Sequence, residues 1–370
     1  MKYYLLLIAF IVLPTSFIKA ETADVDVPNP TEESADRPSD KKGYVNVKKV
    51  VNTIKDHLTF NAYAQLGFDY NDKSSPRDQF KVARIIAFVT GQVTRDLSAR
   101  IMFDVKNANL FEAWANYHIS DAFQVKLGQF KTPFSIENPY SPTTLELINC
   151  ASLVTNYMIG GSSALTMPGA TGRDLGLSVY GELLGGHVTY DLAIMNGQGK
   201  NKSDGNSQKD FVARIGVIPV KGLTLSGSMI RGTGNVAATL SEDGSHYVST
   251  AGDIGGIHAN GNFRRDRYSV GAELKTKPVN LRTEYMAGIE GRSHSKGYYA
   301  TGSLNRIVGN LDVVASYDWL DTWEDRKQRY TAGVQYWFYP KCRAQLNYTY
   351  KKNGAAPDEN SIQAQIQLAF

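Results

Sequence analysis

The last ten residues of the chain alternate strictly between apolar and polar side chains. Residues 361–370 read SIQAQIQLAF, with Ile362, Ile366, Leu368 and Phe370 on one face and glutamines on the other. A period of two is typical of a β-strand. Soluble proteins usually blunt an apolar edge strand with charge or proline, and this segment has neither. Its apolar face therefore needs either a covering strand or lipid.

The same alternation recurs from Leu58 to the C terminus and predicts sixteen strands, an even number. They are expected near residues 58–70, 79–90, 97–106, 109–119, 122–131, 173–182, 187–196, 209–218, 222–230, 267–275, 279–290, 296–304, 310–319, 328–339, 342–351 and 361–370.

The connections between these segments sort by length. After even-numbered segments they are short, at residues 120–121, 183–186, 219–221, 276–278 and 340–341. After odd-numbered segments they are mostly longer, and 132–172 and 231–266 are the extremes. Outer-membrane barrels have short periplasmic turns and longer extracellular loops, whereas a soluble sandwich has no reason to sort its loops. We expect a closed antiparallel transmembrane β-barrel with both termini in the periplasm.

Charge follows the same division, because nearly all charged strand residues share the face opposite the apolar one. Arg or Lys on the lipid face at the bilayer midplane costs about 2–4 kcal/mol, which would produce this segregation. A sandwich with a dry inner face also explains one apolar face, although not the loop lengths. The second segment departs from this rule, since Lys81 and Arg84 are three residues apart and strict alternation would place them on opposite faces. We place Arg84 inside and Lys81 at the rim; a β-bulge would serve equally well.

The start of the chain predicts export. Lys2, the apolar block LLLIAFIVL and the small residue Ala20 follow the order of a secretory signal, and nine apolar residues are too few for a spanning helix. The expected organisation is a signal peptide at 1–20, a mostly disordered periplasmic extension at 21–57, rich in Pro, Ser and charge, and the barrel at 58–370. The predicted location is the cell outer membrane.

Composition adds mainly exclusions. The net charge of +4 gives no basic footprint for nucleic acid. Cys150 and Cys342 are too few for a disulfide framework. The barrel topology puts one in the third loop and the other at a periplasmic turn, separated by much of the barrel height, so free thiols are expected.

The sequence gives little support for a catalytic site or a metal site. The six histidines are scattered, and His118 and Glu112, on one face of one segment, are about 20 Å apart at strand rise. That distance prevents a nucleophile–base pair, and no cluster has metal-ligand spacing. We expect no enzyme activity and no cofactor. The alternatives kept open are an outer-membrane barrel enzyme, of phospholipase or protease type, and a soluble β adhesin.

Five stretches resemble the phosphate-selective porin O and P family of outer-membrane porins. They are FKVARIIAFVTGQVTRDLSARIMFDV (80–105), FQVKLGQFKTPFSIENPYSP (123–142), YDLAIMNGQGKN (190–201), LRTEYMAGI (281–289) and YTAGVQYWFYPKCRAQLNY (330–348). The resemblance implies a sixteen-stranded barrel, usually a homotrimer, whose third extracellular loop folds into the lumen and narrows it. The ending QIQLAF, with Phe370 last, resembles the signal read by the barrel-assembly machinery.

On this sequence the implied constriction loop is the segment from Lys131 to Gly172, next to the stretch GQFKTPF. Its candidate constriction residues are Pro133, Phe134, Glu137 and Glu146. Ser141 and Pro142 suit the start of a short helix over 142–154. The family's selectivity is attributed to basic side chains along the pore, yet this loop offers only Lys131 against two glutamates.

The inward strand charges are near balance. The candidate pore-lining residues are Arg84, Arg100, Asp104, Glu112, Lys126, Lys131, Arg214, Arg282, Glu284 and Arg329. A further basic run, GNFRRDR with Arg264, Arg265 and Arg267, is expected at a loop end near the mouth. The sequence predicts diffusion of small hydrophilic solutes and ions with a mild anion preference, set by Arg84, Arg100, Lys126 and Lys131 opposite the third loop. The alternative is a solvated network in which such bases pair with Asp104, Glu112 and Glu284.

Overall fold

The computed structural model describes residues 57–370 except 162–168 and 250–251, so the predicted signal peptide and nearly all of the predicted extension lie outside the described residues. The barrel strands are β1 (Leu58–Asn71), β2 (Asp78–Gln92), β3 (Leu97–Asp104), β4 (Asn109–Ser120), β5 (Phe123–Lys131), β6 (Arg173–Leu183), β7 (Val188–Met195), β8 (Asp210–Val220), β9 (Leu223–Asn235), β13 (Asn262–Lys275), β14 (Val279–Glu290), β15 (Ser293–Val308), β16 (Leu311–Asp321), β17 (Arg326–Tyr339), β18 (Cys342–Asn353) and β19 (Glu359–Ala369).

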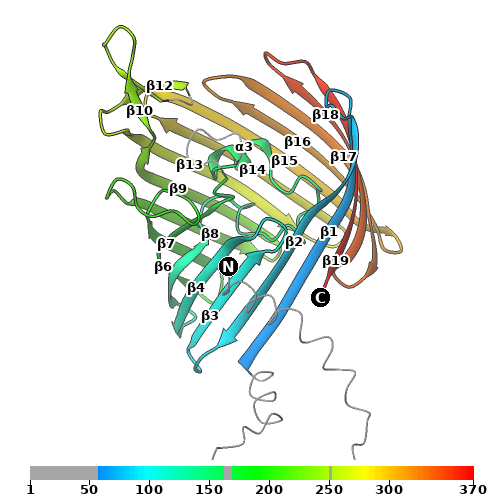
Figure 1. Cartoon of the computed structure of the whole chain (residues 1–370). Helices are drawn as coiled ribbons and strands as arrows, with labels where there is room; N and C mark the ends of the chain where they lie inside the picture. The colour runs from blue at the N-terminus through cyan, green and yellow to red at the C-terminus, as the bar shows by residue number, and fades with distance from the viewer. Residues whose placement is uncertain (1–56, 162–168, 250–251) are drawn as a thin grey trace, which may run out of the picture. The chain divides into compact units, whose positions relative to one another are not determined.

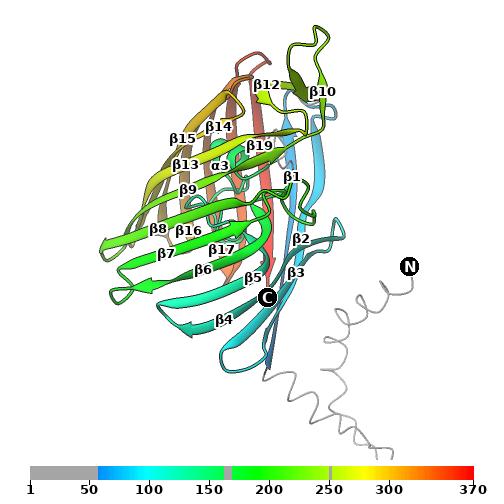
Figure 2. The same ribbon diagram turned by 90° about the vertical axis from the view of Figure 1, so that its left-hand side faces the viewer.

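These sixteen strands form one closed antiparallel barrel (Figures 1 and 2). β1 and β19 complete it, paired from Tyr63 opposite Ala369 to Asn71 opposite Ser361. Closure matters because a strand edge in hydrocarbon would leave backbone N–H and C=O groups without partners. The predicted strand number, order and closure are confirmed.

The two faces of the strands have opposite character. In β19, Ile366 is 50% exposed whereas Gln365 is 3% exposed, and in β14 exposed Leu281 and Tyr285 flank buried Arg282 and Glu284. Tyrosine and tryptophan rings on β15–β18 lie with centroids 4.9–6.3 Å apart, formed by Tyr298, Tyr317, Trp319, Tyr330 and Tyr350. An exposed apolar surface with aromatic rings and a polar interior is the arrangement expected of a barrel in lipid. Among the described residues, no helix is long and apolar enough to cross a bilayer.

The parity break in the second strand is a β-bulge. Gln65 pairs with Arg84 and the next residue, Leu66, pairs with Val82, so β2 carries one extra residue. The bulge returns Lys81 and Arg84 to the same side, where Lys81 donates to Asp69 and Arg84 Nη1 donates to Gln65 Oε1 (2.7 Å). The β-bulge, one of the two explanations offered for the break in alternation, is therefore correct.

The longest predicted loop is partly strand. β9 and β13 continue past their predicted ends to pair Asn235 with Asn262, and a small sheet of β10 (Ala238–Leu240), β11 (Tyr247–Ser249) and β12 (Gly252–Ile257) follows β9. Buried Ile254, Ile257 and Phe263 form an apolar cluster there. Gly255 and Gly256 in β12 have positive φ, which interrupts the period of two there. β10 and β11 have three residues each, too few for the alternation to be recognised.

The helix predicted over 142–154 is wrong. After Ser141 only a single turn forms, through Thr144 N and Leu145 N donating to Ser141 O (2.9 and 3.3 Å). Arg343 Nη2 then donates to Leu145 O (2.7 Å), and Gln345 Nε2 donates to Glu146 O (3.0 Å). Side chains of β18 thus occupy carbonyls that a helix would use.

The helix in this connection begins later, as α3 (Leu153–Met158). Ser152 is its N-cap, because its Oγ accepts from Thr155 N (3.2 Å).

Both cysteines are free thiols, as predicted. The expected reason, a separation of much of the barrel height, was partly wrong. Cys150 Sγ lies 3.9 Å from Pro142 O, and the same oxygen accepts from Nη2 of Arg343 (3.3 Å), the residue next to Cys342. The two cysteines are therefore closer than a barrel height.

Candidate functional site

Arg282 on β14 joins one side of the barrel to the connection 132–172. Its guanidinium is 5% exposed and contacts three carboxylates: Nε donates to Glu273 Oε1 (2.9 Å), Nη2 donates to Glu146 Oε1 (2.9 Å), and Nη1 lies 3.7 Å from Glu137 Oε1. Lys275 Nζ adds a second cation 3.0 Å from Glu273. One buried cation therefore bridges a strand carboxylate and two loop carboxylates.

Glu284, also on β14, holds the backbone of the same connection. Its carboxylate accepts from Ser135 Oγ (2.8 Å), Ile136 N (2.9 Å), Tyr299 OH (3.1 Å) and Ser269 Oγ. Four donors to one carboxylate satisfy its lone pairs without a cation. Ser135 has φ of +72°, a strained conformation for a residue other than glycine that these bonds help to hold.

The helix α3 is held to neighbouring strands in the same way. Arg329 Nε donates to Asp318 Oδ2 (2.8 Å). Both members of this pair also contact the start of α3, because Arg329 Nη2 donates to Ala151 O (2.9 Å) and Leu153 N donates to Asp318 Oδ1 (3.3 Å).

At the other end of the helix, Arg267 pairs with Glu290 (2.7 Å) and also donates to Met158 O. Tyr157 OH donates to Glu290 Oε2 (3.0 Å).

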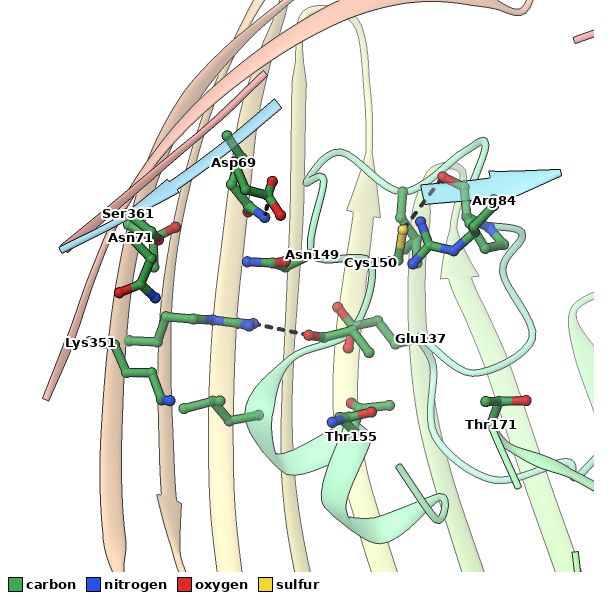
Figure 3. Close-up of a pocket in the computed structure, with 18 of the residues that line it drawn as sticks. Asp69, Asn71, Arg84, Glu137, Asn149, Cys150, Thr155, Thr171, Lys351 and Ser361 are labelled. Atoms are coloured by element: carbon green, nitrogen blue, oxygen red, sulfur yellow. Dashed lines mark hydrogen bonds between the residues drawn. The ribbon is translucent and has the colours of Figure 1, made fainter. Parts of the chain in front are cut away.

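The buried carboxyl of Glu137 is shifted in pKa by these surroundings. Burial raises the pKa of its carboxyl to about 7, against the opposing effects of Arg282 and of Ser152 N, which donates to Glu137 Oε2 (2.9 Å). Figure 3 shows Glu137 close to the helix that bears Thr155 and across the cavity from Lys351 and Asn71.

On the opposite side of the barrel, β2–β8, several bases lack an acidic partner, although Lys81 pairs with Asp69 and Arg173 with Glu112. Arg100 Nε donates to Thr90 Oγ1 (3.0 Å), and its guanidinium lies 5.2 Å from the Phe88 ring centroid and 5.1 Å from that of Trp114. Lys126 Nζ lies 5.2, 5.6 and 4.5 Å from the centroids of Trp114, Phe130 and Tyr180. In the described part of the chain, no carboxylate oxygen lies within 4.0 Å of the basic groups of Arg84, Arg100, Lys126, Lys131 and Arg214.

The remaining acids on this side are occupied. Glu112 Oε1 lies 3.0 Å from Arg173 Nη2, and Asp104 accepts from Asn107 Nδ2 (2.6 Å). Arg173 was not predicted as a site residue, because its position next to inward Asp174 gave it the outward parity. The sequence did show a cation on the apolar side of the alternation, at a strand end beside a long loop, and this could have marked Arg173 as a site residue.

The predicted loop residues have different positions. Lys131 donates to Asn138 O (2.8 Å) and Tyr140 O (2.5 Å), Pro133 lines a cavity, and Phe134 is fully buried in an apolar cluster with α3. Phe370, at the end of the chain, is 78% exposed, and its backbone N donates to Ala62 O (3.0 Å).

The basic run at 264–267 does not form a set of free charges at a loop end. All three arginines lie within β13 and pair: Arg264 with Asp266 (2.6 Å), Arg265 with Asp210 (2.5 Å) and Arg267 with Glu290 (2.7 Å). The pairing register of the strands decides which carboxylates lie beside these arginines, and the sequence alone did not predict that register.

Two cavities adjoin the connection 132–172. One, of about 570 Å³, is lined by Asp69, Asn71, Arg84, Glu137 and Lys351 among others (Figure 3). The second, of about 270 Å³, lies against the β3–β8 side. They share four lining residues: Tyr63, Lys131, Pro142 and Arg173. Over the described ranges, no group of three or more His, Cys, Asp or Glu side chains could hold a metal ion.

A closed sixteen-stranded barrel with an apolar outer face and a charged interior has the fold of an outer-membrane porin. The family model described as phosphate-selective porin O and P matches residues 59–370, and the chain belongs to this family. It is therefore a porin that forms a channel in the outer membrane, and it is neither an enzyme nor a soluble adhesin. No curated protein matches it in sequence.

Solved porin structures resemble the fold at low sequence identity. A loop-deletion mutant of OmpT from Vibrio cholerae has a TM-score of 0.61 at 11% identity, and the trimer form of OmpT has 0.59 at 10%. An anion-selective porin from Comamonas acidovorans has 0.59 at 12%. Each match covers 85% of this chain and 99% of the other.

Proposed function

We propose that this porin passes small hydrophilic solutes and ions with a mild preference for anions, set by Arg84, Arg100, Lys126 and Lys131. The observation that carries the proposal is the unequal pairing of charges around the barrel. On β13–β18 each inward carboxylate has a basic partner or several hydrogen-bond donors, whereas on β2–β8 these bases have no carboxylate within ion-pair distance. An unpaired charge acts on ions in the channel, while a close pair largely cancels itself.

The connection 132–172 acts, in this proposal, as the constriction loop inside the lumen. Its contacts with Arg282, Glu284, Arg329 and Arg343 support this, because all four side chains are on the polar face of their strands. The loop would displace the path of solutes toward β2–β8, past Lys131 and Arg173. Passing ions would then meet the unpaired bases rather than the paired ones.

A dedicated phosphate site is not part of the proposal. Several donors must converge on a phosphate to hold it. Arg100 and Lys126 instead lie over aromatic rings, and Arg100 Nε also donates to Thr90 Oγ1. The family name implies selection of phosphate or other anions, and the chemistry of this chain favours the broader class.

Reversal potentials in planar bilayers under a potassium chloride gradient test the proposal. Arg100→Glu combined with Lys126→Glu should move the channel toward cations. The matched control, Lys296→Glu with Lys352→Glu, changes the total charge equally at exposed positions on the outward face and should leave the potential unchanged. An unchanged potential in the first variant would refute the assignment, and block of the chloride current by micromolar phosphate would instead support a phosphate site.

The proposed assembly is a homotrimer inserted by the barrel-assembly machinery through the C-terminal segment ending in Phe370. Its support is the family membership and the trimer form of OmpT among the similar structures. Cross-linking in outer-membrane vesicles should give a trimer.

A further inference from the structure

The 270 Å³ cavity combines unpaired cations with apolar surfaces. Its barrel side carries Arg100, Lys126 and Arg214 beside Trp114 and Phe130, and its loop side carries three prolines at positions 133, 139 and 142. Lys131 and Arg173 add two more cations. The two lining carboxylates are both occupied, Glu112 by Arg173 and Asp191 by Ser178 Oγ. Among the described residues, the cations Arg100, Lys126 and Arg214 have no carboxylate within 4.0 Å.

The register leaves space next to the indole of Trp114. On the β5 side Trp114 is paired with Gly128, and Gly128 is paired with Gly176 on β6, so these two positions carry no side chain beside the ring. Arg100, the partner of Trp114 on β3, and Lys126 lie over the ring, with their charged groups 5.1 and 5.2 Å from its centroid. Gly128 cannot be exchanged easily, because a Cβ there would lie 2.2 Å from Ala113 O, and its φ is +131°. The cavity wall beside Arg100 and Lys126 therefore consists of the Trp114 indole next to positions without side chains.

This combination fits one class of solute better than others. An inorganic anion such as chloride gains from the cations but nothing from Trp114, Phe130 or the prolines. An anion whose acid group is attached to a flat ring gains from both, through charge at its acid end and ring contact at the other. The volume is slightly below the roughly 300–1,000 Å³ of drug-sized sites, which suits one ring with an acid group.

We propose that this cavity is a binding site for ring-bearing organic anions of the aryl carboxylate class, with the ring on Trp114 and the acid group at Arg100 and Lys126. The inference rests on the proposed anion preference and names the solutes that benefit most from it. Such a solute would be concentrated in the channel and would compete there with chloride.

Block of the single-channel chloride current by added acids tests the site. Benzoate should block wild type at a concentration about fivefold lower than acetate, the size of effect expected from one added ring contact. Cyclohexanecarboxylate, similar in size but not flat, should block less than benzoate. In Trp114→Leu the advantage of benzoate over acetate should disappear, whereas Trp114→Phe should keep most of it.

The readouts separate failure of this inference from failure of the proposed function. If the reversal potential shows an anion preference but benzoate blocks no better than acetate, the aryl site is refuted and the anion preference stands. If benzoate blocks better than acetate in a channel without anion preference, the site stands and the proposed selectivity is refuted. Undiminished benzoate block in Trp114→Leu also overturns the site. Heat-modifiable migration on unboiled gels confirms that each variant is folded.

Discussion

The two sides of the barrel use the same kinds of charged residue in opposite ways. On β13–β18, Arg282 contacts three carboxylates and Arg329 contacts Asp318, and these groups also bind the connection 132–172. On β2–β8, Arg100 and Lys126 lie against aromatic rings, and no carboxylate of the described residues lies within 4.0 Å of their charged groups. The charges of the first side hold a loop through ion pairs, and in our proposal those of the second side act on passing solutes. A count of inward charges, which is near balance, therefore says little about selectivity.

The two arrangements also differ in how they respond to mutation. Removing one member of a buried ion pair leaves an uncompensated charge, which typically costs about 3–5 kcal/mol, although the intact pair contributes much less. A cation over an aromatic ring gains about 0.5–2 kcal/mol and leaves no orphaned charge when it is removed. Substitutions on β13–β18 should change stability, and substitutions on β2–β8 should change permeation.

The largest effect is expected from Arg282→Leu. This change leaves Glu137, Glu146 and Glu273 close together without their shared buried cation. We expect the free energy of unfolding to fall by about 3–5 kcal/mol, measured by urea titration in detergent micelles with tryptophan fluorescence. Single-channel traces should also become noisier as the loop loses its attachment.

The matched control is Lys275→Leu, which removes the other cation at Glu273. Lys275 is about half exposed, so its loss should cost about 0–1 kcal/mol. Equal losses in the two variants would contradict the view that Arg282 organises the loop through buried pairs.

The sequence predicted the barrel well because its main features are local and periodic. A period of two places Leu281 and Arg282 on opposite faces whatever their neighbours, and lipid on one side makes the pattern strict. Even the bulge near Arg84 was visible as a break in parity. The short strands β10–β12 were missed because the first two have only three residues each and glycines interrupt the pattern in the third.

The partners of each charge could not be predicted, because they depend on the stagger of neighbouring strands and the path of one long loop. Arg265 was expected only as part of a basic run at a loop end near the mouth, and the structure pairs it with Asp210, 55 residues earlier in the chain. The helix expected after Ser141 is displaced because Arg343 and Gln345, about 200 residues later, occupy the carbonyls it would need. The same limit explains why Arg173 was missed.

An intermediate effect is expected from Glu137→Gln, through pH. Burial raises the pKa of Glu137 from its ordinary value of 4.5 to about 7. Between these values the folded protein binds more protons than the unfolded chain, so this group's contribution to stability falls as pH rises from about 4.5 to 7. The unfolding free energy of wild type relative to Glu137→Gln should fall by on the order of 2–3 kcal/mol over that range. Parallel profiles for the two proteins would show that Glu137 does not titrate there.

The smallest effect should come from neutralising a complete pair, Asp318→Asn with Arg329→Gln. The two charges are 2.8 Å apart and buried, so at the distance of a passing ion their fields nearly cancel, and removing both should leave the reversal potential unchanged. The asparagine amide oxygen can still accept from Leu153 N, so the start of α3 should keep this attachment. Lys126→Gln alone, which removes a charge without a carboxylate partner, should shift the potential measurably in the same bilayers. A shift as large from the pair as from Lys126 would mean that solutes do pass along β16 and β17, and the distinction between the two sides would then be wrong.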